Sequence, residues 1–194
     1  MRAPVPFTPP PLPVAASPLI RDDVALAAIP AAAWDALAGG QPFVSHAFLS
    51  ALHATGCATP HTGWTPRYLT AWQDHALVGA LPLYAKAHSY GEYVFDWGWA
   101  EAYRRHGRRY YPKLVAAVPF TPVPGPRLLA PGSVVRRALL DHAQGLVRHG
   151  DYSSLHVLFP PAGQTAEGAA LGMTTRHGVQ FHWANPGYRD FADF

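Results

Sequence analysis

The sequence is poor in cysteine and in charge. Cys57 is the only cysteine among 194 residues, which excludes an internal disulfide and a cysteine-based zinc site. Charged residues make up 14% of the chain and hydrophobic residues 49%, whereas charged residues reach about 25% in an average soluble domain. A chain of this composition must bury much apolar surface, so disorder of the whole chain is excluded.

Long apolar runs and strong net charge are also missing. No run approaches the roughly 18 to 20 apolar residues of a membrane-spanning helix, and prolines interrupt the N-terminus where a signal peptide needs an unbroken apolar stretch. The formal net charge of +3 is small for a dedicated nucleic-acid binder. We therefore expect a cytoplasmic protein with no membrane span and no DNA partner.

Several catalytic motifs are absent. The sequence has no H-E-x-x-H, no G-x-S-x-G and no Walker loop, and Cys57 has no evident base beside it. Among the 11 histidines, the pairs His46/His53 and His142/His149 are seven residues apart, which is too far for one metal ion on a helix. We expect no metal site, and neither a serine hydrolase, a P-loop ATPase nor a thiol enzyme.

The 21 prolines are unevenly spread. They are dense in residues 1–18, which we expect to form a proline-rich disordered tail, and the remaining chain is long enough for one domain over 19–187. Periodicity predicts strands over 19–29, 67–73, 76–87, 113–120, 153–159 and 173–183. It predicts helices over 30–38, 45–56, 98–106, 133–149 and 164–171. Asp74 and His75 form a polar connection that suits a hairpin.

The end of the sequence has aromatic residues at helical spacing. Tyr188, Phe191 and Phe194 follow this pattern, with no residue that would end a helix after them. We expect residues 188–194 to begin a helix that leads into a further, missing C-terminal half.

Four long segments carry a family resemblance: FVSHAFLSALHATG, GALPLYAKAHSYGEYVFDWGWAEAY, YYPKLVAAVPFTPVPGPRLL and FHWANPGYRDFADF. Together with the order of the elements, they resemble the FemAB-like proteins of bacteria, which are linked to peptidoglycan biosynthesis or recognition. The resemblance covers Phe43 to Phe194. It implies an α/β (α+β) fold of the GNAT acyltransferase type, with a central mixed, mostly antiparallel sheet flanked by helices. It also implies two GNAT-like halves in tandem, of which this chain is the N-terminal one.

The usual GNAT phosphate loop, [RQ]-x-x-G-x-[GA], is missing. Its place is taken by TPVPGPR, where prolines remove amide donors that a phosphate cradle needs. This argues against acetyl-CoA as a ligand of this chain. Thr121 and Arg127 remain as candidates for holding a substrate or an anion. The alternative is a rigid turn followed by Ser133 as an ordinary helix N-cap.

The segment HSYGEYVFDWGW has the best candidates for acid–base chemistry. Glu92 and Asp96 lie four residues apart and share a face, and nearby aromatic rings would raise a carboxyl pKa toward the range of a general base. His88 and Tyr90 could complete the cluster. We expect this segment to line the main functional cleft. The alternative is that Asp96 caps a helix and Glu92 is a paired or solvated carboxylate.

Two further groups are candidates for substrate binding. Tyr111 and Lys113 precede one predicted strand, and His182, Trp183 and Asn185 follow the last one, where such residues can line a peptide or sugar pocket. Their alternative role is in the core or an interface. Arg104, Arg105, Arg108 and Arg109 form a basic patch that suits an anionic substrate or tRNA, or else a solvated helix end.

Two functions follow from the resemblance. The first is an acyltransferase that moves an aminoacyl or other acyl group from a donor such as aminoacyl-tRNA or acyl-CoA to an amine, with a small molecule or a peptidoglycan-related peptide as acceptor. The second is a catalytically silent half that recognises a peptide or glycan. A solvent-open cleft holding His88, Glu92 and Asp96 would favour the enzyme, whereas burial without a pocket would favour the recognition half.

Overall fold

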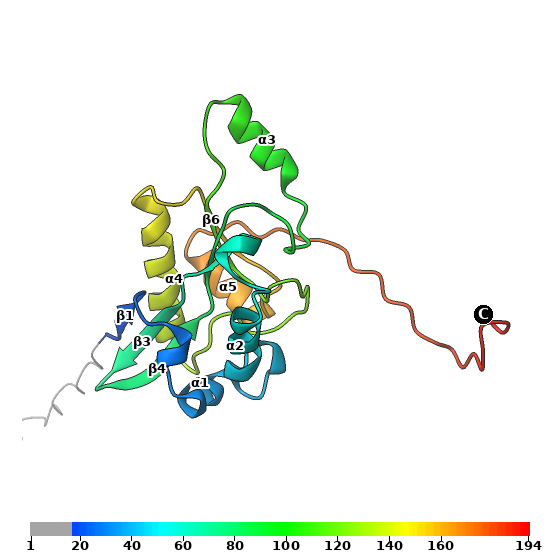
Figure 1. Cartoon of the computed structure of the whole chain (residues 1–194), viewed down its shortest axis with the longest axis horizontal. Helices are drawn as coiled ribbons and strands as arrows, with labels where there is room; N and C mark the ends of the chain where they lie inside the picture. Colours follow the sequence, from blue (N-terminus) through cyan, green and yellow to red (C-terminus); the bar gives the residue numbers. More distant parts are fainter. Residues whose placement is uncertain (1–16) are drawn as a thin grey trace, which may run out of the picture.

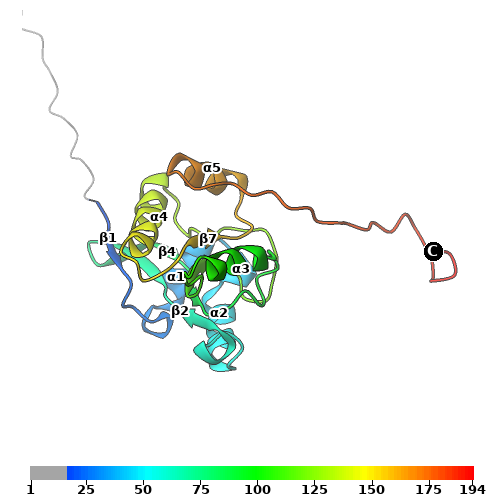
Figure 2. The same cartoon turned by 90° about the horizontal axis from the view of Figure 1, so that it is seen from above.

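The computed structural model describes residues 17–194, so all but the last two residues of the predicted tail at 1–18 lie outside the described residues. The described chain forms a mixed α/β body (Figure 1). Helix α3 projects from one side of this body, and the C-terminal segment runs away from it, as the view from above also shows (Figure 2).

The strands of the described chain form two sheets. Their bounds are β1 (Leu19–Arg21), β2 (Trp64–Pro66), β3 (Leu69–Gln73), β4 (Ala76–Leu81), β5 (Tyr84–Lys86), β6 (Lys113–Ala116) and β7 (Leu155–Val157). The first sheet has the order β1-β3-β4 and is antiparallel. The second has the order β2-β5-β6-β7, in which only β6 and β7 pair in parallel. The predicted α/β class with mostly antiparallel strands is confirmed, although two sheets replace the single sheet expected.

The hairpin predicted at Asp74 and His75 joins β3 to β4. Both residues have positive φ angles, 47° and 67°, which is the backbone of a tight turn between antiparallel strands. The predicted strand over 76–87 is divided. It breaks after Leu81, because Pro82 has no N–H to continue the ladder, and resumes as β5 in the other sheet.

Five α-helices accompany the sheets in the described range: α1 (Ala31–Ala38), α2 (His46–Ala54), α3 (Trp97–Arg105), α4 (Ser133–Arg148) and α5 (Ala162–Ala170). Three short 3-10 helices lie at Leu26–Ala28, Pro42–Val44 and Pro60–Thr62. Local signals set several helix ends. Gly39 ends α1 with a φ of 61°, and the Ser45 hydroxyl accepts a hydrogen bond from the Phe48 amide at the start of α2. Ser133 is the first residue of α4, and Gly132 is its N-cap.

Three predicted elements were wrong. The strand expected over 19–29 ends at Arg21 and gives way to a 3-10 helix. Residues 173–183 form no strand, because no neighbouring strand lies beside them and their side chains are mostly exposed. Residues 188–194 form no helical turn; they are irregular, with a bend at 189–190 and a turn at 191–192.

The first sheet is covered on both faces. Ala80 of β4 belongs to the core that contains Trp34 of α1, whereas the adjacent Leu81 belongs to the core that contains Leu139 of α4. Gly79 lets α4 approach closely, since a Cβ there would lie 2.5 Å from Val135 Cγ1. No helix between residues 17 and 194 combines the length and the apolar character needed to cross a membrane.

Candidate functional site

The segment between β5 and β6 carries most of the predicted site residues. It spans residues 87–112 and contains α3. Lys113, the first residue of β6, follows it directly and has no exposed surface. Glu92 and Asp96 also lie inside the protein, with 2% and 1% of their surface exposed. The loop therefore brings two acidic side chains into the core next to a lysine.

Lys113 is the centre of this cluster. Its Nζ donates a hydrogen bond to Glu92 Oε2 at 2.8 Å, to Ser89 Oγ at 3.1 Å and to Asp96 Oδ2. The ammonium thus uses its three N–H groups on three oxygen atoms, all away from water. Buried charges are tolerated only when they are paired in this way. Lys113, Glu92, Asp96 and Ser89 are called the Lys113 cluster below.

Hydrogen bonds extend the Lys113 cluster on both sides. The Tyr110 hydroxyl donates to Asp96 Oδ2 at 2.6 Å and lies 3.4 Å from Nε2 of His156 on β7. On the other side, Ser89 Oγ lies 2.8 Å from the Tyr111 hydroxyl. The His156 Nε2 is also 2.9 Å from Ser154 Oγ. The network connects the loop to both β6 and β7.

The two carboxyl groups have opposite pKa shifts. Burial by itself would raise the pKa of Asp96, but hydrogen bonds, led by the one from Lys113, outweigh it and lower the pKa to about 2. Burial raises the pKa of Glu92, and Lys113 only partly offsets this effect. Burial and the nearby Lys113 charge lower the pKa of His156 to about 4, so this imidazole is neutral at pH 7. Asp96 is therefore the carboxylate that pairs most strongly with the Lys113 ammonium.

A second buried lysine lies beside the Lys113 cluster. Lys86 of β5 has its Nζ 3.8 Å from the ring centroid of Trp64 and donates a hydrogen bond to the Tyr90 carbonyl at 3.1 Å. It has no carboxylate within salt-bridge distance among the described residues. Burial lowers the pKa of Lys86 to about 8. Lys86 is thus held by a ring face and a carbonyl, unlike Lys113.

His88 and Tyr90 do not join the carboxylates as expected. The His88 ring accepts a hydrogen bond from the Tyr90 amide through Nδ1 at 3.3 Å and packs on Gly63, where a Cβ would lie 2.3 Å from Nε2. Burial and Lys86 lower the His88 pKa. Tyr90 is 65% exposed. Of the site residues predicted from the sequence, the network connects four: Glu92, Asp96, Lys113 and Tyr111.

The expectation that Glu92 or Asp96 faces an open cleft is not met. Both carboxyl groups are buried, and the two cavities that stand out in the described chain lie elsewhere. Glu92 is a paired carboxylate, which is the alternative role that the sequence allowed. Asp96 occupies the N-cap position of α3, but its side chain bonds Lys113 and Tyr110 rather than the helix amides. One oxygen of each carboxyl group, Glu92 Oε1 and Asp96 Oδ1, is buried without a hydrogen-bond partner in the described residues.

Arg127, a candidate for holding an anion, is buried and bonded to main-chain carbonyls. Its guanidinium is buried and donates to the main-chain carbonyls of Val123, Gly125, Pro126 and Leu158 at 2.6 to 3.2 Å. Burial lowers the pKa of Arg127 to about 10. Thr121 Oγ1 donates to the Pro119 carbonyl at 3.1 Å. These bonds use four of the five N–H groups of the Arg127 guanidinium and hold the proline-rich segment in place.

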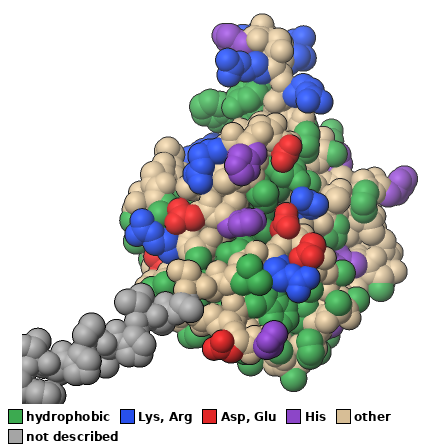
Figure 3. All heavy atoms as spheres, turned by 90° about the vertical axis from the view of Figure 1, so that its left-hand side faces the viewer, with side chains coloured by type: hydrophobic (Ala, Val, Ile, Leu, Met, Phe, Trp, Pro, Cys, Tyr) green, Lys and Arg blue, Asp and Glu red, His purple; other side chains and the backbone are tan. Residues whose placement is uncertain are grey.

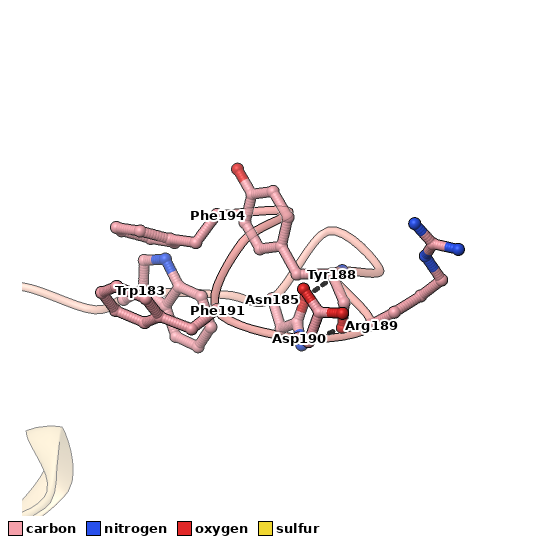
Figure 4. A pocket seen from close by; sticks show the side chains of 7 residues that line it. All are labelled: Trp183, Asn185, Tyr188, Arg189, Asp190, Phe191 and Phe194. Carbon is pink, nitrogen blue, oxygen red and sulfur yellow. Dashed lines mark hydrogen bonds between the residues drawn. The ribbon is translucent and has the colours of Figure 1, made fainter.

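His182, Trp183 and Asn185 lie far from the Lys113 cluster, on the C-terminal segment that runs away from the body. Trp183 and Asn185 line a cavity of about 420 Å³ formed only by this segment, together with Tyr188, Arg189, Asp190, Phe191 and Phe194 (Figure 4). The Asn185 side chain is used locally, because its Oδ1 accepts from the Gly187 and Tyr188 amides. The structure does not bring these residues to Tyr111 and Lys113.

The sequence did not identify Ser89, Lys86 or His156 as part of the network. Ser89 and Lys86 are single polar residues in apolar surroundings, and His156 alternates with apolar residues along β7. The one available signal was a lysine at one end of each of two buried strands, since Lys86 ends β5 and Lys113 begins β6, which indicates a buried partner. Among residues 17–194, no group of three or more His, Cys, Asp or Glu side chains could hold a metal ion.

Comparison with protein families gives one match. A family model named FemAB-like, described as peptidoglycan biosynthesis/recognition, matches residues 25–194. Searches of curated proteins and of solved structures found no match.

Proposed function

The chain belongs to the FemAB-like family of peptidoglycan biosynthesis and recognition, and on this premise we propose that it works in acyl transfer to a peptidoglycan-related peptide. In this reaction the acceptor amine attacks the carbonyl carbon of an ester or thioester donor. An amide bond forms, the donor alcohol or thiol leaves, and the amine loses one proton. Aminoacyl-tRNA and acyl-CoA are the donor classes that we propose.

The unit formed by β6, α4 and β7 supports this proposal. β6 and β7 are parallel neighbours joined by the long helix α4, which is the arrangement that the GNAT resemblance requires around a donor. The proline-rich loop after β6 has few free amides, and the guanidinium of Arg127 donates hydrogen bonds to main-chain carbonyls. These features favour aminoacyl-tRNA over acetyl-CoA. The lone Cys57 fits a reducing compartment, and we propose the cytoplasm.

Within this reaction we assign the present chain to recognition of the acceptor, and the observation that carries this assignment is the burial of Glu92 and Asp96 against Lys113. A general base must come within about 2.6 to 3.2 Å of the amine proton. Carboxylates that are fully enclosed and already bonded to an ammonium do not meet this requirement. A second GNAT-like half, as the resemblance implies, would then supply the catalytic groups.

The experiment is a transfer assay read by mass spectrometry. The chain is incubated with a peptidoglycan stem peptide that has a free amine, and with aminoacyl-tRNA or an acyl-CoA. We expect the chain alone to bind the peptide without adding an acyl group. A longer protein that joins the chain to the second half proposed above should add one acyl group per amine. If neither the chain nor the longer protein acylates the peptide, and the chain does not bind it, the proposed function is wrong.

Two variants separate catalysis from structure in this assay. Glu92→Gln tests the acidic pair, and Asp141→Asn, an exposed carboxylate on α4, is the matched control. Both variants are made in the longer protein, because the chain alone is expected to add no acyl group. We expect Glu92→Gln to lose thermal stability there and to retain turnover in the fraction that stays folded. If a folded Glu92→Gln protein lost turnover 100-fold or more while Asp141→Asn did not, Glu92 would be the general base.

A further inference from the structure

Helix α3 projects from the body and has no buried residue. A nine-residue helix is too short to be stable by itself in water. It is held at its start by the Lys113 cluster and near its end by Tyr110, which is hydrogen-bonded to that cluster. Asp96, which precedes the helix, bonds Lys113, while Tyr103 in its last turn packs edge-on against Tyr110 with ring centroids 5.1 Å apart. The fold thus fixes α3 rigidly while leaving its surface uncovered.

Large aromatic side chains are exposed along and before α3. We call Tyr90, Tyr93, Phe95, Trp97 and Trp99 the aromatic segment. Phe95 is 77% exposed and Trp99 57% exposed. The Tyr90 and Trp97 rings contact each other at 4.9 Å between centroids, so the two ends of the loop present a common aromatic surface. Apolar surface of this extent is characteristic of an interaction site.

The backbone of the aromatic segment is strained. Tyr93 and Phe95 have φ angles of 62° and 50°, in the left-handed region that costs a non-glycine residue about 1 kcal/mol or more. Strain of this kind persists where the surrounding structure imposes it, and it concentrates at ligand-binding sites. Here the left-handed backbone turns the Tyr93 and Phe95 side chains toward solvent, so it does not improve the packing of the core.

The other end of α3 is strongly basic. Arg104, Arg105, Arg108 and Arg109 occur within six residues, and the one acidic residue of α3 is Glu101, three residues before them. Glu101 pairs with Arg104 and approaches Arg105, while Arg108 and Arg109 have no ion-pair partner in the described chain. In Figure 3, the end of the molecule where α3 projects is covered by Lys and Arg side chains, with hydrophobic side chains directly beneath.

Aromatic and basic groups are therefore separated along one element. From Trp97 to Arg104 the helix rises about 10 Å. A ligand that fits this surface has two parts: one with flat apolar faces, and a separate anionic part that reaches the arginines at and after the end of α3. A sugar presents apolar C–H faces that pack on aromatic rings, and carboxylates of a peptide pair with guanidinium groups.

We propose that α3 and its flanks bind an anionic glycopeptide, with the sugar rings on the aromatic segment and the peptide carboxylates at Arg108 and Arg109. This inference rests on the proposed function for its choice of a peptidoglycan fragment as the source. Single-stranded nucleic acid would need phosphate contacts interleaved with the rings instead of separated from them. A lipid surface would not require two separate zones.

The test is calorimetric titration of the chain with a soluble peptidoglycan fragment consisting of a disaccharide and a tetrapeptide. The matching disaccharide without peptide and the tetrapeptide without sugar are titrated separately. We expect the intact fragment to bind at least tenfold more tightly than either part. Trp99→Ala should weaken fragment binding tenfold or more, and the double variant Arg108→Gln/Arg109→Gln should do the same and remove its salt dependence.

Phe181→Ala and Arg137→Gln are the controls, because both residues are exposed and lie outside α3. They should bind the fragment like the wild type, and all variants should keep the wild-type melting temperature. The inference is overturned if the fragment does not bind, if Trp99→Ala binds it unchanged, or if a single-stranded RNA of equal charge binds in its place. Acyl transfer by the longer protein with unchanged affinity in Trp99→Ala would leave the proposed function intact and remove this site.

Discussion

Replacement of Lys113 by methionine is the sharpest perturbation of the Lys113 cluster. Methionine keeps much of the side-chain volume and removes the charge, so Glu92 and Asp96 stay buried without a cation. Removal of one partner from a buried ion pair costs about 3–5 kcal/mol. At pH 7.5 we expect Lys113→Met to lose about 4 kcal/mol of unfolding free energy, which is about 2 M in urea midpoint for a typical m value.

The loss should depend on pH in a known direction. Without Lys113, the pKa values of both buried carboxyl groups rise above their values in the unfolded chain, so protonation favours the folded state. The stability difference between Lys113→Met and the wild type should therefore shrink as the pH falls from 7.5 to 5. The assay is urea unfolding followed by tryptophan fluorescence at both pH values.

Lys86→Met is the matched control for this experiment. Lys86 is equally buried but faces a ring and a carbonyl rather than a carboxylate, so its removal leaves no bare anion. We expect a change below about 1.5 kcal/mol at pH 7.5. A loss below 1 kcal/mol in Lys113→Met, or a loss that is the same at pH 5 and 7.5, would refute the reasoning.

Three further outcomes are expected. The folded state lowers the Lys86 pKa to about 8, so the unfolded chain keeps this proton up to a higher pH than the folded chain does. The unfolding free energy of the wild type should therefore rise by about 1–2 kcal/mol between pH 8 and 9.5. The urea midpoint of Lys86→Met should not show this rise. Arg127→Met should lose about 3 kcal/mol in the same assay by leaving buried carbonyls unpaired, against less than about 0.5 kcal/mol for the exposed Arg137→Met. Tyr110→Phe should lower the unfolding free energy by about 1–2 kcal/mol through loss of the hydrogen bond to Asp96, and an unchanged melting curve would contradict this.

Local chemistry was readable from the sequence. Ser45 caps α2 and Gly39 ends α1, since both effects depend on neighbouring residues only. The turn at Asp74 and His75 follows from two polar residues between strand-like runs. The pattern over 173–183 also predicts a strand, but a strand needs a neighbouring strand to pair with. The described chain provides none for these residues, and the sequence alone does not show this.

The site was readable only in part. The spacing of Glu92 and Asp96 correctly placed two carboxyl groups together, but their partner, Lys113, lies 21 and 17 residues away, beyond the range of any periodic pattern. The position of Lys113 beside aromatic residues at a strand end is compatible with a pocket as well as with the core, so the sequence left both roles open. The sequence offers Arg127 as a candidate for holding an anion or as part of a rigid turn, but it does not show the carbonyl groups that Arg127 binds, which are freed by the irregular backbone of the proline-rich segment. Such partners emerge from tertiary structure alone.

The central claim is that the Lys113 cluster holds residues 90–109 as the recognition surface of the chain. Backbone hydrogen exchange measured by mass spectrometry, with and without the soluble glycopeptide, tests it most directly. We predict that the glycopeptide slows exchange within residues 90–109 in the wild type, and that exchange elsewhere is unchanged. Slower exchange confined to residues 183–194, or no change within 90–109 at a saturating glycopeptide concentration, would contradict the claim.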